Sequence, residues 1–289
     1  MAYAIFMYMS FCLIAKEKQI MLETILLIIV FILGIYFGSF FTLTTYRLPK
    51  NEDITHTHSY CPSCNHKLGM LDLIPVFSYI FLRGKCKYCN KPIGIRYFIF
   101  EILTGITFLL FAISLKIDIY QLNINTIIIF ALTILYFVSL FIIAGIEKEQ
   151  STIQKSILVY GVFVSLVYMI YSYTLTKTNV YEYVIYLSFM IILLFMDIYL
   201  LKKNLKYNYW IQILILILYM LIFSGAYNTI YTIVMAILAI GIKNILKHLK
   251  RRKMRIIKNE KTPIAFFLCV CNIVVIIITN FIVNYMMYY

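Results

Sequence analysis

The sequence contains few charged residues. Only 13% of its 289 residues are Asp, Glu, Lys or Arg, whereas soluble domains carry about 25%. Glycine is also scarce, with ten residues, while 63% of the chain is hydrophobic and the mean hydropathy is +0.90. This composition excludes an ordinary soluble domain, a collagen, a disordered chain and a secreted disulfide scaffold. It predicts an all-α polytopic membrane protein, because nearly every helix in lipid must be apolar all round.

About 20 mostly apolar residues are needed to cross a bilayer as a helix. Applied along the chain, this length predicts eight transmembrane helices. They cover residues 22–46, 97–115, 124–146, 156–175, 181–201, 209–224, 227–246 and 264–286.

The predicted spans divide the chain into segments. Residues 1–21 form an N-terminal extension whose apolar run is too short to span, so it is an interfacial appendage or lies before a start at Met21. Residues 22–46 are the first transmembrane helix. We expect residues 47–96 to form a cytoplasmic loop domain and residues 97–289 a transmembrane domain of about seven helices.

Basic residues are distributed unevenly among the predicted loops. Of the 26 Lys and Arg residues, 22 fall on one side of the membrane, in residues 47–96, 147–155, 202–208 and 243–263. This asymmetry predicts that those segments are cytoplasmic and that both termini lie outside. Topology thus explains most of the net charge of +14, so we expect no nucleic-acid partner. The basic run 243–261 fits an anionic lipid surface better than a nucleic acid.

Four of the seven cysteines form two C-x-x-C pairs, Cys61 with Cys64 and Cys86 with Cys89, separated by 21 residues. Two such pairs are typical of a tetrahedral thiolate site for Zn²⁺. Four thiolates close the coordination shell, so this zinc is expected to be structural and to fold a loop too polar to build its own core. The alternative is a pair of redox dithiols.

Further motifs flank and interrupt the cysteine pairs. They are Gly38–Ser39–Phe40, Tyr46–Arg47–Leu48–Pro49, Asp72–Leu73–Ile74–Pro75, Leu82–Arg83–Gly84, Ile95–Arg96–Tyr97 and Glu101 with Thr104–Gly105. In order and spacing, these motifs and the cysteine pairs resemble the bacterial type IV prepilin leader peptidase/N-methyltransferase family.

This resemblance implies a function. Members of that family are polytopic aspartyl proteases of the bacterial plasma (inner) membrane. They remove the basic leader of type IV pilin-like precursors on the cytoplasmic face and often methylate the new N-terminus with S-adenosylmethionine. For this chain the resemblance therefore implies pilin-like precursors and the lipid bilayer as partners, and S-adenosylmethionine as a cofactor.

The first catalytic aspartate of the family stands in an A-x-I-D pattern, and this chain reads Ala144–Gly145–Ile146–Glu147. Glu147 keeps the carboxylate but displaces it by one methylene, and a misplacement of about 1 Å can cost 10²-fold in rate. Glu147 is the first predicted catalytic residue.

The second family aspartate stands in a G-x-G-D-V-K pattern that this chain lacks. Counting back from Gly225 places the lost position near Gln212 or Ile213, neither of which ionises. The nearest substitute is Asp197, an acid within an apolar run, and it is the second predicted catalytic residue. Alternatively, Asp197 reaches the membrane interface or pairs with Lys202 and Lys203.

Glu101 occupies the position of the family's glutamate at the start of the second span. Two roles stay open for its carboxylate. It can serve the site that binds the methyl donor, as the resemblance implies, or it can hold the basic loop by pairing with Arg96.

The degenerate acid motifs leave a second hypothesis for the whole chain. A catalytically inactive relative would keep the zinc loop and use it to bind pilin-like precursors or an assembly partner. Cleavage of a precursor separates this hypothesis from an active leader peptidase.

Overall fold

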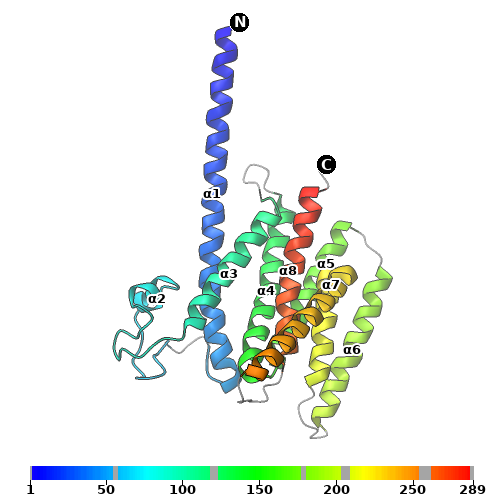
Figure 1. Ribbon diagram of the computed structural model, residues 1–289. Coiled ribbons are helices and arrows are strands. Elements are labelled where there is room, and N and C mark those ends of the chain that lie inside the picture. The colour runs from blue at the N-terminus through cyan, green and yellow to red at the C-terminus, as the bar shows by residue number, and fades with distance from the viewer. Residues whose placement is uncertain are drawn as a thin grey trace. The chain divides into compact units, whose positions relative to one another are not determined.

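A computed structural model describes residues 2–54, 58–117, 123–176, 180–202, 209–253 and 262–286 of the protein. Helices dominate these residues (Figure 1). In chain order the elements are α1 (Ala2–Arg47), η1 (Leu48–Lys50), η2 (Met70–Leu73), α2 (Phe77–Phe81), α3 (Ile95–Ser114), α4 (Ile124–Gln150), α5 (Lys155–Thr176), α6 (Val180–Lys202), α7 (Tyr209–Lys253) and α8 (Ile264–Met286). The described residues contain no strand, so the prediction of an all-α protein is confirmed.

Seven helices in the described part of the chain are long and apolar enough to cross a membrane. They are α1 and α3 to α8, and the residues between α1 and α3 hold the four-cysteine loop. The predicted polytopic architecture is therefore confirmed. Helix α1 already starts at Ala2, well before the predicted first span, so the N-terminal extension is helical and continuous with that span.

Helix α7 accounts for the difference between seven helices and eight predicted spans. Its 45 residues correspond to about 67 Å of helix, roughly twice the hydrocarbon thickness of a bilayer. Gly225 interrupts it with φ 80° and ψ 169°, a conformation that is essentially restricted to glycine. The chain bends sharply there, between the yellow and orange parts of α7 in Figure 1. The predicted spans 209–224 and 227–246 are thus the two parts of one interrupted element.

The chain divides into two compact units. The first contains Met1–Leu43, Thr55–Phe130 and Val283–Tyr289, and the second contains Thr44–Ile54 and Ala131–Ile282. These units divide helices α1, α4 and α8 internally. The domain boundaries expected after residues 21, 46 and 96 therefore stay a prediction.

The core of the second unit is built around α4. Tyr136, Phe137 and Leu140 of this helix are fully buried. The Tyr136 hydroxyl donates to Oδ1 of Asn272 in α8 at 2.7 Å, and Nδ2 of Asn272 donates to the Thr232 hydroxyl in α7 at 3.0 Å. Each of these buried polar groups has a hydrogen-bond partner, so the three side chains join α4, α7 and α8 without leaving an unpaired polar group of their own in the apolar interior.

Candidate functional site

The first C-x-x-C pair lies in a tight turn of the loop between α1 and α3. The amide of Cys61 donates to the carbonyl of His66 at 3.0 Å, and the amide of Asn65 donates back to the carbonyl of Cys61 at 2.8 Å. Asn65 has a positive φ of 56°. Asparagine tolerates this left-handed conformation better than most residues, so the chain can reverse directly after Cys64.

The second pair repeats this turn. The amide of Cys86 donates to the carbonyl of Lys91, the amide of Asn90 donates to the carbonyl of Cys86, both at 2.9 Å, and Asn90 has φ 57°. The asparagine after each second cysteine is a structural signal that the sequence analysis missed. A C-x-x-C-N pattern in both pairs was visible and predicts two equivalent turns.

The two turns bring four sulfur atoms together. The Sγ atoms of Cys61, Cys64, Cys86 and Cys89 all lie within 4.8 Å of one another, and those of Cys61 and Cys89 are 3.9 Å apart. Four thiolates bound tetrahedrally to Zn²⁺ at about 2.3 Å have sulfur atoms about 3.8 Å apart. The cluster therefore fits a four-thiolate zinc site.

The two thiols of the first turn differ in acidity. Burial raises the pKa of Cys61, but hydrogen bonds from the Ser63 and Cys64 backbone and from neighbouring thiols outweigh it and lower the pKa to about 7. A backbone hydrogen bond at His66 lowers the pKa of Cys64, yet partial desolvation and the thiols of Cys61 and Cys89 raise it to about 11. The opposite shifts reflect how closely the sulfur atoms are packed.

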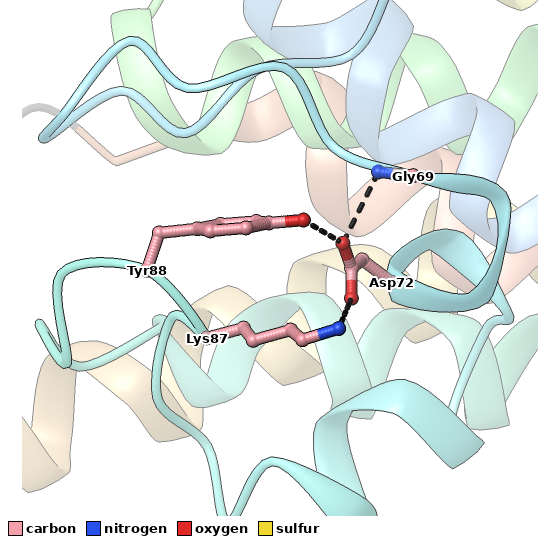
Figure 2. A network of polar contacts seen from close by, with 4 residues as sticks. All are labelled: Gly69, Asp72, Lys87 and Tyr88. Carbon is pink, nitrogen blue, oxygen red and sulfur yellow. Dashed lines mark hydrogen bonds and ion pairs between the residues drawn. The ribbon is translucent and has the colours of Figure 1, made fainter.

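Asp72 connects η2 to the second cysteine turn (Figure 2). Its Oδ2 accepts hydrogen bonds from the Tyr88 hydroxyl at 2.9 Å and from the Gly69 amide at 3.1 Å, and its Oδ1 lies 3.9 Å from Lys87 Nζ. The Tyr88 hydrogen bond is the main cause that lowers the pKa of Asp72. The ring of His66 lies over that of Tyr88, with centroids 3.6 Å apart, so His66 joins this packing.

Glu101 in α3 holds the segment just before α2. Its Oε2 accepts the amide of Val76 at 2.7 Å, and the Ser39 hydroxyl also hydrogen-bonds to its carboxyl group. Arg96, the expected partner, donates instead to the Tyr97 hydroxyl at 3.2 Å. The backbone of Val76 therefore binds the Glu101 carboxylate, and the pairing with Arg96 stays a prediction.

That backbone is strained. Val76 has φ 64° and ψ −53°, and the amide of Phe77 donates to the carbonyl of Pro75 at 2.7 Å, which closes a γ-turn centred on Val76. A β-branched residue in this region costs on the order of 1–3 kcal/mol. The hydrogen bond to Glu101 is what directs the Val76 amide inward, so Glu101 fixes the loop to α3.

The glycine of the Gly38–Ser39–Phe40 motif lets α1 approach α3. A Cβ atom on Gly38 would lie 2.0 Å from Thr104 Oγ1 and 2.8 Å from the Cα of Glu101. Only glycine fits a backbone contact this close. The motif around Gly38 and the motif of Glu101, Thr104 and Gly105, which are distant in the sequence, are thus the two sides of one helix crossing.

Glu147 lies in the last turn of α4, with 1% of its surface exposed. Its carboxylate accepts the Ala265 amide at 3.1 Å, the Phe266 amide and the Tyr209 hydroxyl. Ala265 and Phe266 begin α8, and a carboxylate at a helix N-terminus satisfies its unpaired amides and complements its dipole. The carboxylate therefore joins the ends of α4, α7 and α8.

Asp197 binds a different partner. Its Oδ2 lies 2.6 Å from Nζ of Lys155, which begins α5. Asp197 therefore pairs with a lysine, Lys155. The side chains of Lys202 and Lys203, the predicted partners, lie outside the described residues, so pairing with them stays a prediction. No hydrogen bond or ion pair links Glu147 and Asp197 in the described part of the chain. In Figure 1 the C-terminal ends of α4 and α6 both lie at the lower end of the second unit.

Gln212 is one of the two residues, with Ile213, near which the lost second aspartate was expected. Its side chain is fully buried, and neither Nε2 nor Oε1 has a hydrogen-bond partner among the described residues. It follows Tyr209 by three positions on α7, which places both on one face of the helix. A neutral amide therefore occupies this position, one turn from the tyrosine that binds Glu147.

Comparison with known proteins identifies the region that contains the thiol cluster. Residues 32–115 match the model of the bacterial peptidase A24 N-terminal domain. The match covers the α1–α3 crossing, both cysteine turns, Asp72 and Glu101, and the family resemblance drawn from the sequence is confirmed.

Curated relatives agree with this assignment. A protein of Vibrio cholerae serotype O1 named prepilin leader peptidase/N-methyltransferase is 34% identical over 152 residues, which are 49% of this chain and 55% of that protein. Proteins of the same name match from Bacillus subtilis, at 35% over 116 residues, and from Myxococcus xanthus, at 38% over 81 residues. The chain spans 47% and 24% of the length of these two. No solved structure matches the chain significantly.

These names imply a methyl donor, and the predicted role of Glu101 in binding it stays a prediction. The carboxylate expected to serve it is already bound by the Val76 amide and Ser39. These contacts account for the position of the Glu101 carboxylate between α3 and the loop.

Proposed function

We propose that the protein is a membrane-embedded endopeptidase that removes the basic leader from type IV pilin-like precursors on the cytoplasmic face of the bacterial plasma membrane. The observation that carries this proposal is the A24 N-terminal domain over residues 32–115, followed by membrane-length helices. The excess of Lys and Arg in the loops on one side supports a cytoplasmic location for the thiol cluster.

In this proposal the four cysteines hold a structural Zn²⁺. The site is Cys61, Cys64, Cys86 and Cys89, and its closed shell leaves no position for substrate. Its contribution is to fold the loop and to present its basic surface. Zinc therefore takes no part in bond cleavage.

Cleavage is assigned to Glu147 together with Asp197. Peptide hydrolysis by a carboxylate pair needs one ionised group to activate water and one protonated group to donate to the leaving amine. Glu147 is buried at the end of α4, where a leader would meet the membrane edge, and Asp197 lies near the same end of α6. Removal of the leader would expose a new N-terminus, and its methylation is a further activity suggested by the name of the relatives.

One observation favours a second candidate. All the described hydrogen bonds of Glu147 serve to join helix ends, and Asp197 is neutralised by Lys155. This arrangement suits a catalytically inactive relative that binds pilin-like precursors, or an assembly partner, through the zinc loop.

A cleavage assay separates the two candidates. The purified protein in lipid nanodiscs is incubated with a pilin-like precursor that carries a basic leader, and intact mass reports loss of the leader. The peptidase proposal predicts cleavage by the unmodified protein and a loss of about 10²-fold or more in rate for both Glu147→Gln and Asp197→Asn.

Glu149→Gln is the matched control, because Glu149 is exposed on the same helix end, two positions away. Its rate should equal that of the unmodified protein. Unchanged activity in Glu147→Gln would remove Glu147 from the site. Binding of the precursor without any cleavage would establish the second candidate instead.

A further inference from the structure

The loop between the two cysteine turns exposes large apolar side chains outside the membrane-length helices. Met70 in η2 is 92% exposed and Phe81 in α2 is 79% exposed. Leu71, Phe77 and Ile80 of the same two elements are also exposed. Phe77, Ile80 and Phe81 follow helical spacing and share one face of α2, which packs next to η2. Apolar exposure on this scale marks an interaction surface.

The polar groups of this segment are turned the other way. Asp72, which follows Leu71 directly, keeps only 8% of its side-chain surface exposed, because its carboxylate faces Tyr88, Gly69 and Lys87 (Figure 2). The Glu101 hydrogen bond to Val76 likewise fixes the start of α2 from the inside. The apolar side chains are therefore held outward by internal hydrogen bonds.

The exposed apolar residues lie among cations. From residue 58 to residue 94 the chain carries Lys67, Arg83, Lys85, Lys87 and Lys91, and Asp72 is its one acid. All five cationic residues are exposed. Exposed apolar side chains surrounded by lysine and arginine are typical of a segment that lies in the interface of an anionic membrane.

The position of this segment in the chain supports a lipid partner. Helix α3 begins at Ile95, shortly after the second cysteine turn, and it is long and apolar enough to cross the membrane. The loop is thus tethered where α3 enters the bilayer, which raises the local concentration of lipid around it.

We infer that η2 and α2 form an interfacial anchor, which inserts Met70, Leu71 and Phe81 at the level of anionic lipid headgroups. The basic residues around it bind the headgroup phosphates, and the Asp72 network keeps η2 in the inserting orientation. This role goes beyond the proposed peptidase activity and requires no substrate.

Tryptophan quenching in nanodiscs tests the anchor. The chain has a single tryptophan, Trp210, so Trp210→Phe gives a silent background in which Phe81→Trp or Leu71→Trp reports position. Nanodiscs contain phosphatidylglycerol with brominated acyl chains. The matched control is Ser63→Trp, at an exposed position of the first cysteine turn that carries no neighbouring apolar group of this kind. Retained zinc content shows that each variant is folded.

We expect Phe81→Trp and Leu71→Trp to be quenched about twofold or more strongly than Ser63→Trp. Replacing phosphatidylglycerol by brominated phosphatidylcholine, or changing Lys67 and Lys85 to Glu, should reduce that quenching at low salt. Equal quenching in all three variants would overturn the proposal. So would shielding of the Phe81→Trp fluorophore only after a precursor peptide is added, because the surface would then bind a protein segment rather than lipid.

Discussion

The four-cysteine loop and the acidic residues of α4 and α6 differ in how far apart their functional groups lie in the sequence. The four thiols come from one short stretch, Cys61 to Cys89, and two equivalent turns bring them within 4.8 Å of one another. Glu147 instead binds groups from Tyr209, Ala265 and Phe266, which belong to the much later helices α7 and α8. Local residue spacing therefore specifies the thiol cluster, whereas the packing of distant helices determines the surroundings of Glu147.

The two regions also differ in how closely they follow the family pattern. The loop keeps the motifs on which the family resemblance rests, and it lies within the residues that match the A24 N-terminal domain model. In the acid region, Glu147 stands at the position predicted for the first family aspartate, and a buried glutamine lies near the position predicted for the second. If this difference holds, substitutions in the loop should change the zinc content and the folding of the loop. Substitutions in the acid region should change the stability of the joined helix ends and the rate of precursor cleavage.

The largest effect is expected from Cys61→Ser. Three thiolates and a hydroxyl bind zinc far more weakly than four thiolates, so metal content should fall from about one zinc per chain to nearly none. Cys271→Ser, which changes a buried thiol of α8, should leave zinc unchanged. Metal analysis of both purified variants checks this. A loop that stays protease-resistant with no metal in the unmodified protein would favour redox dithiols.

Glu147→Ala should produce the next largest effect. Loss of the carboxylate leaves the Ala265 and Phe266 amides and the Tyr209 hydroxyl without their acceptor, at a cost of about 3 kcal/mol. Thermal unfolding in detergent should show a clearly lower transition than in Glu149→Ala, while the zinc content stays normal. Equal transitions in the two variants would mean that Glu147 does not join the helix ends.

Gly38→Ala should weaken the crossing of α1 and α3. The added methyl group collides with Thr104 and with the backbone at Glu101, so we expect a loss of about 1–3 kcal/mol. Gly241→Ala is the control, because nothing lies within 4 Å of its Cβ position and alanine favours helix by up to about 1 kcal/mol. Thermal unfolding should therefore show a lower transition for Gly38→Ala and a higher one for Gly241→Ala than for the unmodified protein. A stabilising effect of Gly38→Ala would contradict the close approach.

Gln212→Leu should give the smallest effect, and a stabilising one. It replaces a buried amide that has no hydrogen-bond partner among the described residues by an apolar side chain of similar size, which we expect to gain about 1 kcal/mol. Precursor cleavage should be unchanged, because the proposal assigns the second acid to Asp197. A large loss of cleavage with normal stability would instead place Gln212 in contact with the substrate.

Features that depend on local pattern were predictable from the sequence. The helical membrane class, the thiol cluster and the family resemblance followed from hydropathy, cysteine spacing and closely spaced motifs. The break at Gly225 lies in the gap between the predicted spans 209–224 and 227–246, although the two spans form a single interrupted element. The left-handed asparagines after each cysteine pair were overlooked, even though their repeated position was available.

Contacts between distant segments were harder to predict. The partner of Glu101 is a backbone amide in a γ-turn, and a backbone amide carries no side-chain signal that could compete with nearby Arg96. Lys155 and Asp197 lie in different helices, so the packing of α5 and α6 had to be known before this pair could be named. The role of Glu147 at the start of α8 depended in the same way on a helix much later in the chain.

The most direct test is the intact mass of a pilin-like precursor after incubation with the purified protein in nanodiscs. We predict that the unmodified protein and Glu149→Gln remove the basic leader, and that Glu147→Gln leaves the precursor at full length. A precursor that binds the unmodified protein and keeps its leader would contradict the proposed peptidase activity.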